Sequence, residues 1–453
     1  MKAMYASMKE TGFGANVDPD IFVPYLEKLF VKHVSEYQEV DSCELDSREL
    51  MREFTNGELE YAFKSMNSKG KSCNGYSPKE LKELQEYAKI PLTDIFNDTL
   101  KTGEFPSFWL TAKVVFIHKE GNWKDPGNFR SINVQDACLK LFNKCMSNRL
   151  DVFLEKNSIP HKSQFAYRKG LGTLAPTLIL HELARTVIKA KKGRKLYTYF
   201  VDFSKAFDGI NRDKLRQKLL NAGAPLMFVN LVLHTFDNTV LRVGTNDAYV
   251  GNVKTNTGIL QGSPLSSLLF NCFIADLAKE FQDFVPTLQE KRIPCISYAD
   301  DIVLFAESPK EMKMMLKKLE DYCNQNDLKI NTKKTKIMIF RAGGGYTRDD
   351  VFEINGNNIE IVNKFKYLGT FFTPRLSFSL QAEYLITKAR SKIGLLFART
   401  PIKEVSLDLA LKLFQCYVTP ILEFNMVIWT SDFKEALNGT INSIFTKFSY
   451  KFN

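Results

Sequence analysis

The sequence predicts an α+β fold, in which strands in the middle of the chain are flanked by helical segments. Apolar residues recur at helical spacing over residues 137–154 and 174–189. Residues 197–203 are instead dense in aromatic and β-branched side chains, which favour a strand. Two short apolar runs, 295–297 and 302–305, predict a hairpin with Asp300 and Asp301 at its tip.

The remaining elements follow from local patterns along the chain. A helical pattern over 54–66 ends in a polar, glycine-containing break at 68–75, and helical signals resume at 78–97. An extended apolar stretch at 112–117 leads into a turn-rich segment at 121–128, which predicts a hairpin.

Two helix starts can be placed from their capping residues. Asn211 is expected to cap a helix that ends before Gly223. Ser308 and Glu311 predict a capping box with Pro309 at the first helical position. Five apolar residues form the expected buried stripe of that second helix: Met312, Met315, Leu316, Leu319 and Tyr322.

The composition limits the classes of protein to which this chain can belong. The 453 residues suffice for two to four compact units, and 62 basic against 51 acidic residues give a net charge of +11. Such a charge favours a polyanionic partner, either nucleic acid or an acidic membrane. A signal peptide and a run of about 18 apolar residues are both lacking, so we expect an intracellular chain without a membrane partner.

The eight cysteines are scattered along the sequence. They form no Cys-x-x-Cys pair and no cluster at zinc-ligand spacing, so we expect reduced residues that lie mostly in the core. They are Cys43, Cys73, Cys138, Cys145, Cys272, Cys295, Cys323 and Cys416.

Three carboxylates carry the chemistry that the sequence suggests. Asp202 ends one predicted strand, and Asp300 and Asp301 lie at the hairpin tip, so strand ends of one sheet can bring the three together. Converging carboxylates repel each other unless they are protonated or bridged by cations, and oxygen ligands of this kind select Mg²⁺ or Mn²⁺. A two-metal phosphoryl-transfer site is the expected result.

These carboxylates stand within three longer motifs. Residues 200–208 read Phe-Val-Asp-Phe-Ser-Lys-Ala-Phe-Asp, residues 258–266 read Gly-Ile-Leu-Gln-Gly-Ser-Pro-Leu-Ser, and residues 298–301 read Tyr-Ala-Asp-Asp. Their content and order resemble those of reverse transcriptases. Residues 128–132 (Asn-Phe-Arg-Ser-Ile), 69–75 and 365–369 resemble further motifs of the non-LTR (LINE-type) retrotransposon enzymes, and the resemblance covers roughly residues 50–450.

The resemblance implies a right-hand polymerase fold with fingers, palm and thumb. The palm would be an antiparallel sheet bearing the catalytic aspartates. We expect a mostly helical N-terminal extension (1–95), fingers (96–195), a palm with interleaved fingers elements (196–375) and a helical thumb (376–453). No endonuclease-like or ribonuclease H-like segment is recognised, which suits a fragment, a decayed copy or a free-standing polymerase.

The resemblance also assigns roles to individual residues. Asp202 and Asp300 would bind two Mg²⁺ ions, with Mn²⁺ as an alternative, Asp301 would support them, and Phe203 would lend its backbone carbonyl. The residues expected to bind the nucleotide are Lys119, Arg130, Phe207, Gln261 and Gly262, with Phe207 beneath the sugar. The expected primer grip is Tyr367, Leu368 and Gly369. The basic residues expected to contact nucleic acid are Lys334, Lys336, Lys388, Arg390 and Lys392.

The resemblance therefore implies an RNA-directed DNA polymerase. Its partners would be an RNA template, a DNA primer or target DNA, and deoxynucleoside triphosphates, and its expected location is the nucleus. An inactive RNA-binding protein that retains the fold, or a group II intron-type enzyme, remains the alternative. A viral-type RNA-templated RNA polymerase is disfavoured, because that class typically carries an Asp at the position that Phe207 occupies here.

Overall fold

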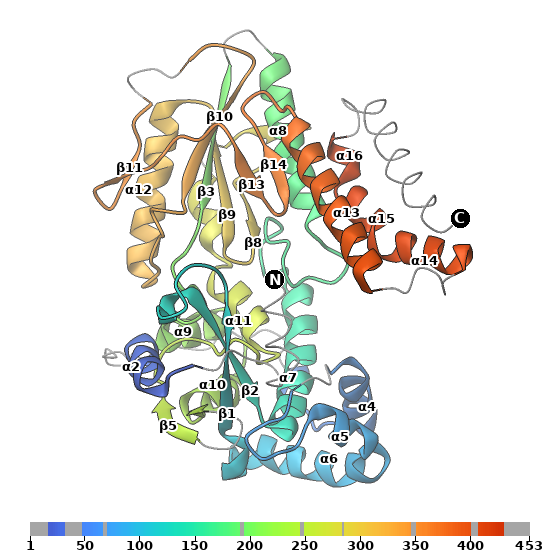
Figure 1. Ribbon diagram of the computed structural model, residues 1–453. Helices are drawn as coiled ribbons and strands as arrows, with labels where there is room; N and C mark the ends of the chain where they lie inside the picture. The colour runs from blue at the N-terminus through green and yellow to red at the C-terminus, as the bar shows by residue number, and fades with distance from the viewer. Residues whose placement is uncertain are drawn as a thin grey trace. The chain divides into compact units, whose positions relative to one another are not determined.

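The computed structural model describes residues 17–31, 48–66, 70–190, 194–244, 249–282, 285–345, 350–399 and 406–429 (Figure 1). The chain divides into two compact units. Unit 1 consists of Met1–Tyr167, Phe203–Glu280 and Asp321–Ile330, and unit 2 consists of Arg168–Asp202, Phe281–Glu320 and Asn331–Asn453. Two positions singled out from the sequence lie outside the described ranges: Cys43, and residue 69 at the start of the 69–75 motif.

Side-chain caps fix the starts of three of the helices in the N-terminal part of unit 1. Asp18 caps α2, while Thr55 and Ser77 each form a full capping box at the starts of α4 and α5. Gly103, in a left-handed conformation, ends α6. The helices are α2 (Pro19–Phe30), α3 (Arg48–Met51), α4 (Asn56–Ser65), α5 (Pro78–Glu83) and α6 (Gln85–Thr102).

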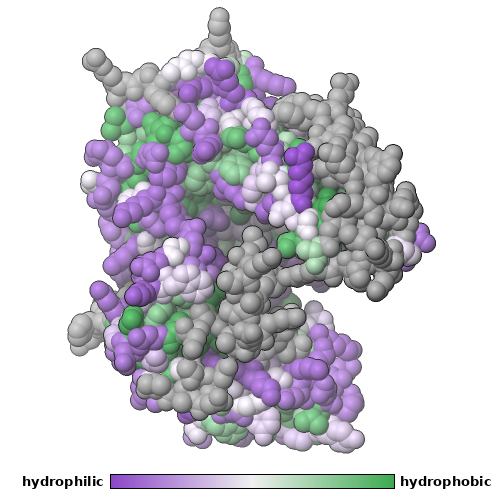
Figure 2. Space-filling model, in the orientation of Figure 1, coloured by the Kyte–Doolittle hydropathy of each residue, from purple (hydrophilic) through white to green (hydrophobic). Residues whose placement is uncertain are grey.

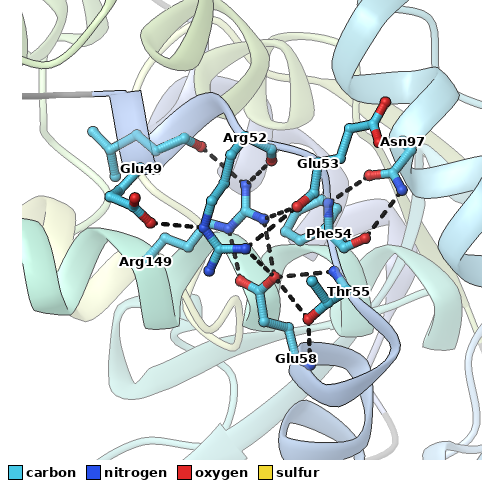
Figure 3. Close-up of polar contacts among 9 residues, drawn as sticks. Glu49, Arg52, Glu53, Phe54, Thr55, Glu58, Asn97 and Arg149 are labelled. Carbon is cyan, nitrogen blue, oxygen red and sulfur yellow. Dashed lines mark hydrogen bonds and ion pairs between the residues drawn. The ribbon is translucent and has the colours of Figure 1, made fainter.

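A buried arginine ties these N-terminal helices to α7 (Ala137–Lys156). The Arg149 guanidinium donates to the backbone carbonyls of Leu50, Arg52 and Glu53 and forms an ion pair with Glu58 at 2.9 Å (Figure 3). It also lies 3.9 Å from the ring centre of Phe54. Because a buried cation is costly unless it is fully bonded, this set of partners indicates that residues 48–58 are an integral part of unit 1.

The sheet of unit 1 has the strand order β2-β1-β4-β5. The strands are β1 (Thr111–His118), β2 (Phe129–Gln135), β4 (Val240–Gly244) and β5 (Tyr249–Lys254). The β1–β2 pair is the hairpin that the sequence predicts, whereas β4 and β5 were not predicted. β1 runs antiparallel to β2 but parallel to β4, and α2 packs against β4 and β5.

Further helices complete unit 1. Asn211 caps α9 (Arg212–Asn221) as predicted, by accepting from the amides of Asp213 and Lys214. α9 packs against α10 (Leu226–Asp237) and α11 (Ser266–Phe273). Three short 3₁₀ helices lie at Ser107–Trp109, Pro126–Asn128 and Leu277–Phe281, the last of which extends into unit 2.

Unit 2 is built around an antiparallel sheet with the order β10-β3-β9-β8. Its strands are β3 (Lys195–Val201), β8 (Cys295–Tyr298), β9 (Asp301–Ala306) and β10 (Lys336–Arg341). The two central strands are almost wholly buried, as expected for strands covered on both faces. Helix α8 (Leu174–Ala190) packs against β3, β8 and β10 (Figure 1).

Helix α12 (Pro309–Gln325) carries the predicted buried stripe, and all five of its members are at most 3% exposed. Its N-terminal cap differs in part from the prediction. The Glu311 amide donates to Ser308 as expected, but the Glu311 carboxylate accepts from the amide of Glu307. In a capping box the carboxylate would accept from the amide of Ser308 itself, so here it bonds one residue before the cap.

Small hairpins and helices complete unit 2. The hairpin strands are β6 (Thr287–Leu288), β7 (Lys291–Arg292), β11 (Glu353–Ile354), β12 (Asn357–Asn358), β13 (Phe365–Tyr367) and β14 (Thr370–Phe372). The helices are α13 (Ser379–Arg399), α14 (Leu407–Tyr417), α15 (Thr419–Leu422) and α16 (Met426–Trp429). Ala389, Ala410, Phe414, Val418 and Leu422 form a separate apolar core among α13, α14 and α15.

The described surface and the described cysteines have the properties that the composition predicts. Polar residues dominate the described surface in the view of Figure 2. Among the described residues, no helix is long and apolar enough to cross a membrane. The seven described cysteines are free thiols; four of them are buried and Cys416 is exposed.

Candidate active site

The carboxylates predicted from the sequence meet at one end of the unit 2 sheet. Val201 of β3 pairs with Ile302 of β9, so the same register continued by one residue sets Asp202 opposite Asp301. Asp300 lies in the tight turn between β8 and β9, where Ala299 adopts a positive φ of 56°. The strand register thus places the three residues at the same end of one sheet, whereas their roles in catalysis and metal binding stay predictions.

The charges at this end of the sheet interact. Loss of surrounding water, together with repulsion from Asp300 and Asp202, raises the pKa of Asp301 to about 6, and Lys334 opposes the shift. The backbone of Asp202 is fixed by its neighbours, since its amide donates to the Thr335 hydroxyl and its carbonyl accepts from the Asn331 amide. Within the described ranges, no three His, Cys, Asp or Glu side chains are gathered closely enough to form a metal cluster.

A groove of about 520 Å³ adjoins the carboxylates. Asp202, Asp301 and Phe200 line it, and Phe200 stacks on Phe365 at 4.1 Å between ring centres. Five lysines also line the groove: Lys333, Lys334, Lys336, Lys364 and Lys366. A lining that combines ammonium groups with aromatic rings suits a ligand that has both phosphates and rings.

The predicted primer grip forms the tip of the β13–β14 hairpin. Leu368 and Gly369 both have positive φ values, 43° and 88°, which turn the chain between the two strands. A Cβ on Gly369 would lie 2.9 Å from the Phe424 ring, so only glycine fits there. Tyr367 lines the groove, and its buried hydroxyl has no hydrogen-bond partner among the described residues.

The predicted nucleic-acid contacts fall into two groups within unit 2. Lys334 and Lys336 line the groove, although Lys336 also pairs with Glu360 at 2.7 Å. Three others, Lys388, Arg390 and Lys392, lie on α13 and do not line the groove. There the ammonium groups of Lys388 and Lys392 lie 4.9 and 5.1 Å from the ring centres of Tyr384 and Tyr417, respectively.

Unit 1 gathers a second set of predicted residues around the turn after Asp202. The ring of Phe207 is half-buried and stacks on Phe270 at 4.7 Å. The Gln261 side chain donates to the carboxylate of Asp208 at 3.3 Å. Gly262 has a φ of 119°, and a Cβ there would lie 2.5 Å from the carbonyl oxygen of Asn133. Glycine is therefore required for the loop to approach β2.

The other predicted residues of unit 1 are less closely grouped. Lys119 is exposed and lies within electrostatic range of Asp208. Its positive charge opposes the rise that burial causes in the pKa of that carboxylate. Arg130 is exposed on β2 opposite Ile117, and no contact with the other predicted nucleotide-binding residues is seen in the described ranges. Phe203 is buried and forms an isolated bridge with Ile330.

Asp208 is the residue to which the sequence reading gave no role. It is 6% exposed, and burial raises its pKa to about 6 against the opposing effects of Lys205, Gln261 and Lys119. Its backbone oxygen would lie 2.6 Å from a Cβ on Gly258. The turn and the Gly258–Gly262 loop are therefore in close backbone contact, which leaves no room for a side chain at Gly258. The sequence holds a signal that could have identified Asp208 as a functional candidate. It is an acidic residue among apolar residues, two positions before Ile210, and an acid is costly to bury there.

Comparison with known proteins identifies the family to which a chain with this fold and these carboxylates belongs. The model of the reverse transcriptase (RNA-dependent DNA polymerase) family matches residues 117–372, more than half of the chain. The chain therefore belongs to the reverse transcriptase family.

Its relatives are proteins of retrotransposons. The polyprotein of the type-1 retrotransposable element R2 from Popillia japonica is 26% identical over 60% of this chain and 39% of its own length. The RNA-directed DNA polymerase of the mobile element jockey from Drosophila funebris is 27% identical over 76% of this chain and 38% of its own length. The predicted resemblance to non-LTR enzymes is thus confirmed, and the chain spans less than half the length of these relatives.

Solved structures of telomerase were also matched. Apo telomerase from Candida tropicalis aligns with a TM-score of 0.46 at 12% identity, over 81% of this chain and 68% of that chain.

Proposed function

We propose that this chain is an RNA-directed DNA polymerase that extends the 3′-hydroxyl of a primer on an RNA template. The observation that carries the proposal is the placement of Asp202 opposite Asp301 by the β3–β9 register, with Asp300 in the adjoining turn. Membership of the reverse transcriptase family supports it. The proposed substrates are deoxynucleoside triphosphates, and the proposed nucleic-acid partners are an RNA template and a DNA primer.

The donor chemistry of the three carboxylates, rather than the spacing of their side chains, suits a divalent metal ion. Carboxylate oxygens are the donors that Mg²⁺ and Mn²⁺ prefer. Burial, together with the charges of Asp300 and Asp202, raises the pKa of Asp301, and a bound cation would offset both effects. Asp202 and Asp300 would hold two Mg²⁺ ions, with support from Asp301 and the backbone carbonyl of Phe203. When bound, such ions lower the pKa of an attacking hydroxyl and neutralise charge on a leaving pyrophosphate.

The chain's own residues would hold the two substrates. The groove beside Asp202, which lysines and aromatic residues line, is suited to the primer end, because ammonium groups pair with phosphates and rings pack against sugars and bases. In unit 1, Gln261 and Gly262 would allow the nucleotide a close approach, and Phe207 would pack beneath its sugar.

A primer-extension assay tests the proposal. The chain is mixed with an RNA template, an annealed DNA primer, deoxynucleotides and Mg²⁺, and we expect extended DNA that depends on the template and on the metal. Substitution of Asp202 by Asn should abolish the product. If the wild-type chain gives no extension with either Mg²⁺ or Mn²⁺ while it binds the primer–template, the alternative of an inactive RNA-binding protein is favoured.

A further inference from the structure

Helix α12 of unit 2 carries a row of lysines on the side that faces away from its buried stripe. Lys310, Lys313 and Lys317 follow one another at helical spacing, and all three are exposed. Together with Met314, which is 38% exposed, they line a groove of about 620 Å³. Lys317 pairs with Glu320 at 3.4 Å. Within the described part of the chain, Lys310 and Lys313 form neither an ion pair nor a hydrogen bond, so both ammonium groups are open to a ligand.

The charges along α12 are arranged against its helix dipole. A helix is stabilised by acids near its N-terminus and by bases near its C-terminus. In α12 the lysines occupy the N-terminal half, Glu320 and Asp321 lie in the C-terminal half, and the last turn contains no base. The first turn has one acid, Glu311, whose carboxylate accepts from the amide of Glu307. Stability of the helix therefore does not account for lysines at these positions, whereas an anionic ligand does.

The row begins at the end of the unit 2 sheet that is opposite to the carboxylates. Strand β9 starts at Asp301 and extends for about 17 Å to Ala306, and α12 begins three residues later (Figure 1). The α12 lysines do not line the groove beside Asp202, and the residues of that groove do not line theirs. The two grooves of unit 2 are therefore separate sites.

Other cations lie at the same end of the sheet. Lys195 at the start of β3 is opposite Arg341 at the end of β10, and Arg194 pairs at 4.0 Å with Glu307 in the connection to α12. The carboxylate of Asp350 is buried and pairs with Lys195 at 3.7 Å. Since Glu307 and Asp350 are both paired with cations, their charges are offset locally and do not cancel those of the α12 lysines.

We propose that the outer face of α12 binds the phosphate backbone of RNA at a site separate from the groove that adjoins Asp202. Lys310 and Lys317 are about 10 Å apart along the helix axis, which is the axial length of about three phosphates of one strand. The exposed Met314 between them offers an apolar contact to a sugar. Charge complementarity favours a nucleic acid, and the choice of RNA rests on the proposed function, in which the template is RNA.

A gel-shift measurement with two nucleic acids tests the proposal. The full chain is first saturated with an unlabelled short primer–template, which occupies the polymerase site, and a labelled RNA hairpin is then added. We expect the wild-type chain to bind the hairpin. The triple variant Lys310→Ala, Lys313→Ala, Lys317→Ala should bind it about tenfold or more weakly, and the slope of log affinity against log salt should fall by about 2. Its affinity for the short primer–template should stay unchanged.

Two control variants separate a local site from the total charge of the chain. Arginine at the same three positions of α12 keeps the charges and should bind the hairpin as wild type does. The variant Lys64→Ala, Lys71→Ala, Lys79→Ala removes three exposed lysines from unit 1 and should also leave hairpin binding unchanged. The α12 triple-alanine variant should melt at the same temperature as wild type or at a higher one, because the removed charges oppose the helix dipole.

Three results would overturn the proposal. The first is wild-type affinity for the hairpin in the α12 triple-alanine variant. The second is an equal loss of affinity in the unit 1 control, which would mean that binding follows the total charge. The third is displacement of the hairpin by polyglutamate as effectively as by RNA of equal charge, which would assign the face to an acidic protein.

Hairpin binding requires no catalysis, so this inference and the proposed function can fail separately. A chain that binds the hairpin through α12 but extends no primer would contradict the polymerase function alone. A chain that extends primers while its α12 triple-alanine variant binds the hairpin normally would contradict the role of α12 alone.

Discussion

Asp202 and Asp301 lie opposite each other at the ends of two central, antiparallel strands of unit 2, one residue beyond the pair Val201–Ile302. Facing residues in an antiparallel pair point to the same side of the sheet, so the two carboxylates share one face. Their repulsion contributes to the raised pKa of Asp301. Such a pair is stabilised by a bound cation, which is the basis of the first prediction.

Substitution of Asp202 or Asp300 by Asn should lower kcat for primer extension by at least about 10²-fold, since charge stabilisation in the transition state is lost. Affinity for RNA should stay equal or increase, because a negative charge near a polyanion is removed. Extension rates and filter binding measure the two effects. Asp94→Asn, at an exposed position of α6, is the matched control. Near-wild-type extension by a folded Asp202→Asn variant would show that the metal assignment is wrong.

Phe207 should set the preference for deoxynucleotides. A ring beneath the sugar leaves no space or hydrogen-bond partner for a 2′-hydroxyl, so Phe207→Val should raise the relative use of ribonucleotides by roughly 10²-fold, at about tenfold for each 1.4 kcal/mol. The ratio of kcat/KM for a ribonucleotide and its deoxy counterpart measures the effect. Phe207→Tyr keeps the ring and should keep the ratio. An unchanged ratio in an active Phe207→Val enzyme would leave Phe207 a packing residue.

Arg149→Ala should destabilise unit 1 by about 3–5 kcal/mol, because several carbonyls and Glu58 lose their buried partner. Urea unfolding followed by fluorescence measures the change. Lys64→Ala removes an exposed ion pair with Glu60 and should cost less than about 1 kcal/mol. Similar losses in the free energy of unfolding for the two variants would mean that residues 48–58 are only weakly packed against the rest of unit 1.

The basic residues of α13 should make primer–template binding depend on salt. Each phosphate neutralised contributes a slope of roughly −0.7 to −0.9 to log affinity against log salt. The double variant Lys388→Ala, Lys392→Ala should therefore weaken binding and reduce the slope by about 1.5. Lys79→Ala, which removes an exposed lysine paired with Glu83, should change neither. An unaltered slope in the double variant would make these lysines a solvated surface only.

The buried Asp208 should lower stability at neutral pH. Its folded-state pKa of about 6 lies above the ordinary value of 3.8, so the folded protein binds this proton more tightly than the unfolded chain. Its contribution to the free energy of unfolding is thus greatest below about pH 4 and is lost as the pH rises to about 6, by about 3 kcal/mol.

Asp208→Asn keeps an oxygen that can accept from Gln261 and removes the charge. We expect this variant to melt at a higher temperature than wild type at pH 7 and to lose the difference near pH 4. Melting curves at intervals between pH 4 and 8 test this. Parallel pH dependences for the two proteins would contradict a raised pKa at Asp208.

Local patterns were enough to predict several elements and the family. The Asn211 cap, the α12 stripe and the β8–β9 hairpin follow from capping, helical periodicity and turn residues, which act within a few positions of the chain. The three motifs with their aspartates identified the family for the same reason, since each is continuous in sequence.

Tertiary structure decided the relationships that join distant segments. The pairing of β3 with β9 sets Asp202 opposite Asp301, and packing places Tyr25 over Lys205 and Asp208 beside Gln261. None of these follows from local propensity, because strand register and side-chain packing depend on which apolar surfaces are buried together. The sequence by itself thus determined the family and predicted which residues carry the chemistry, while burial and strand pairing determined which of those residues lie together.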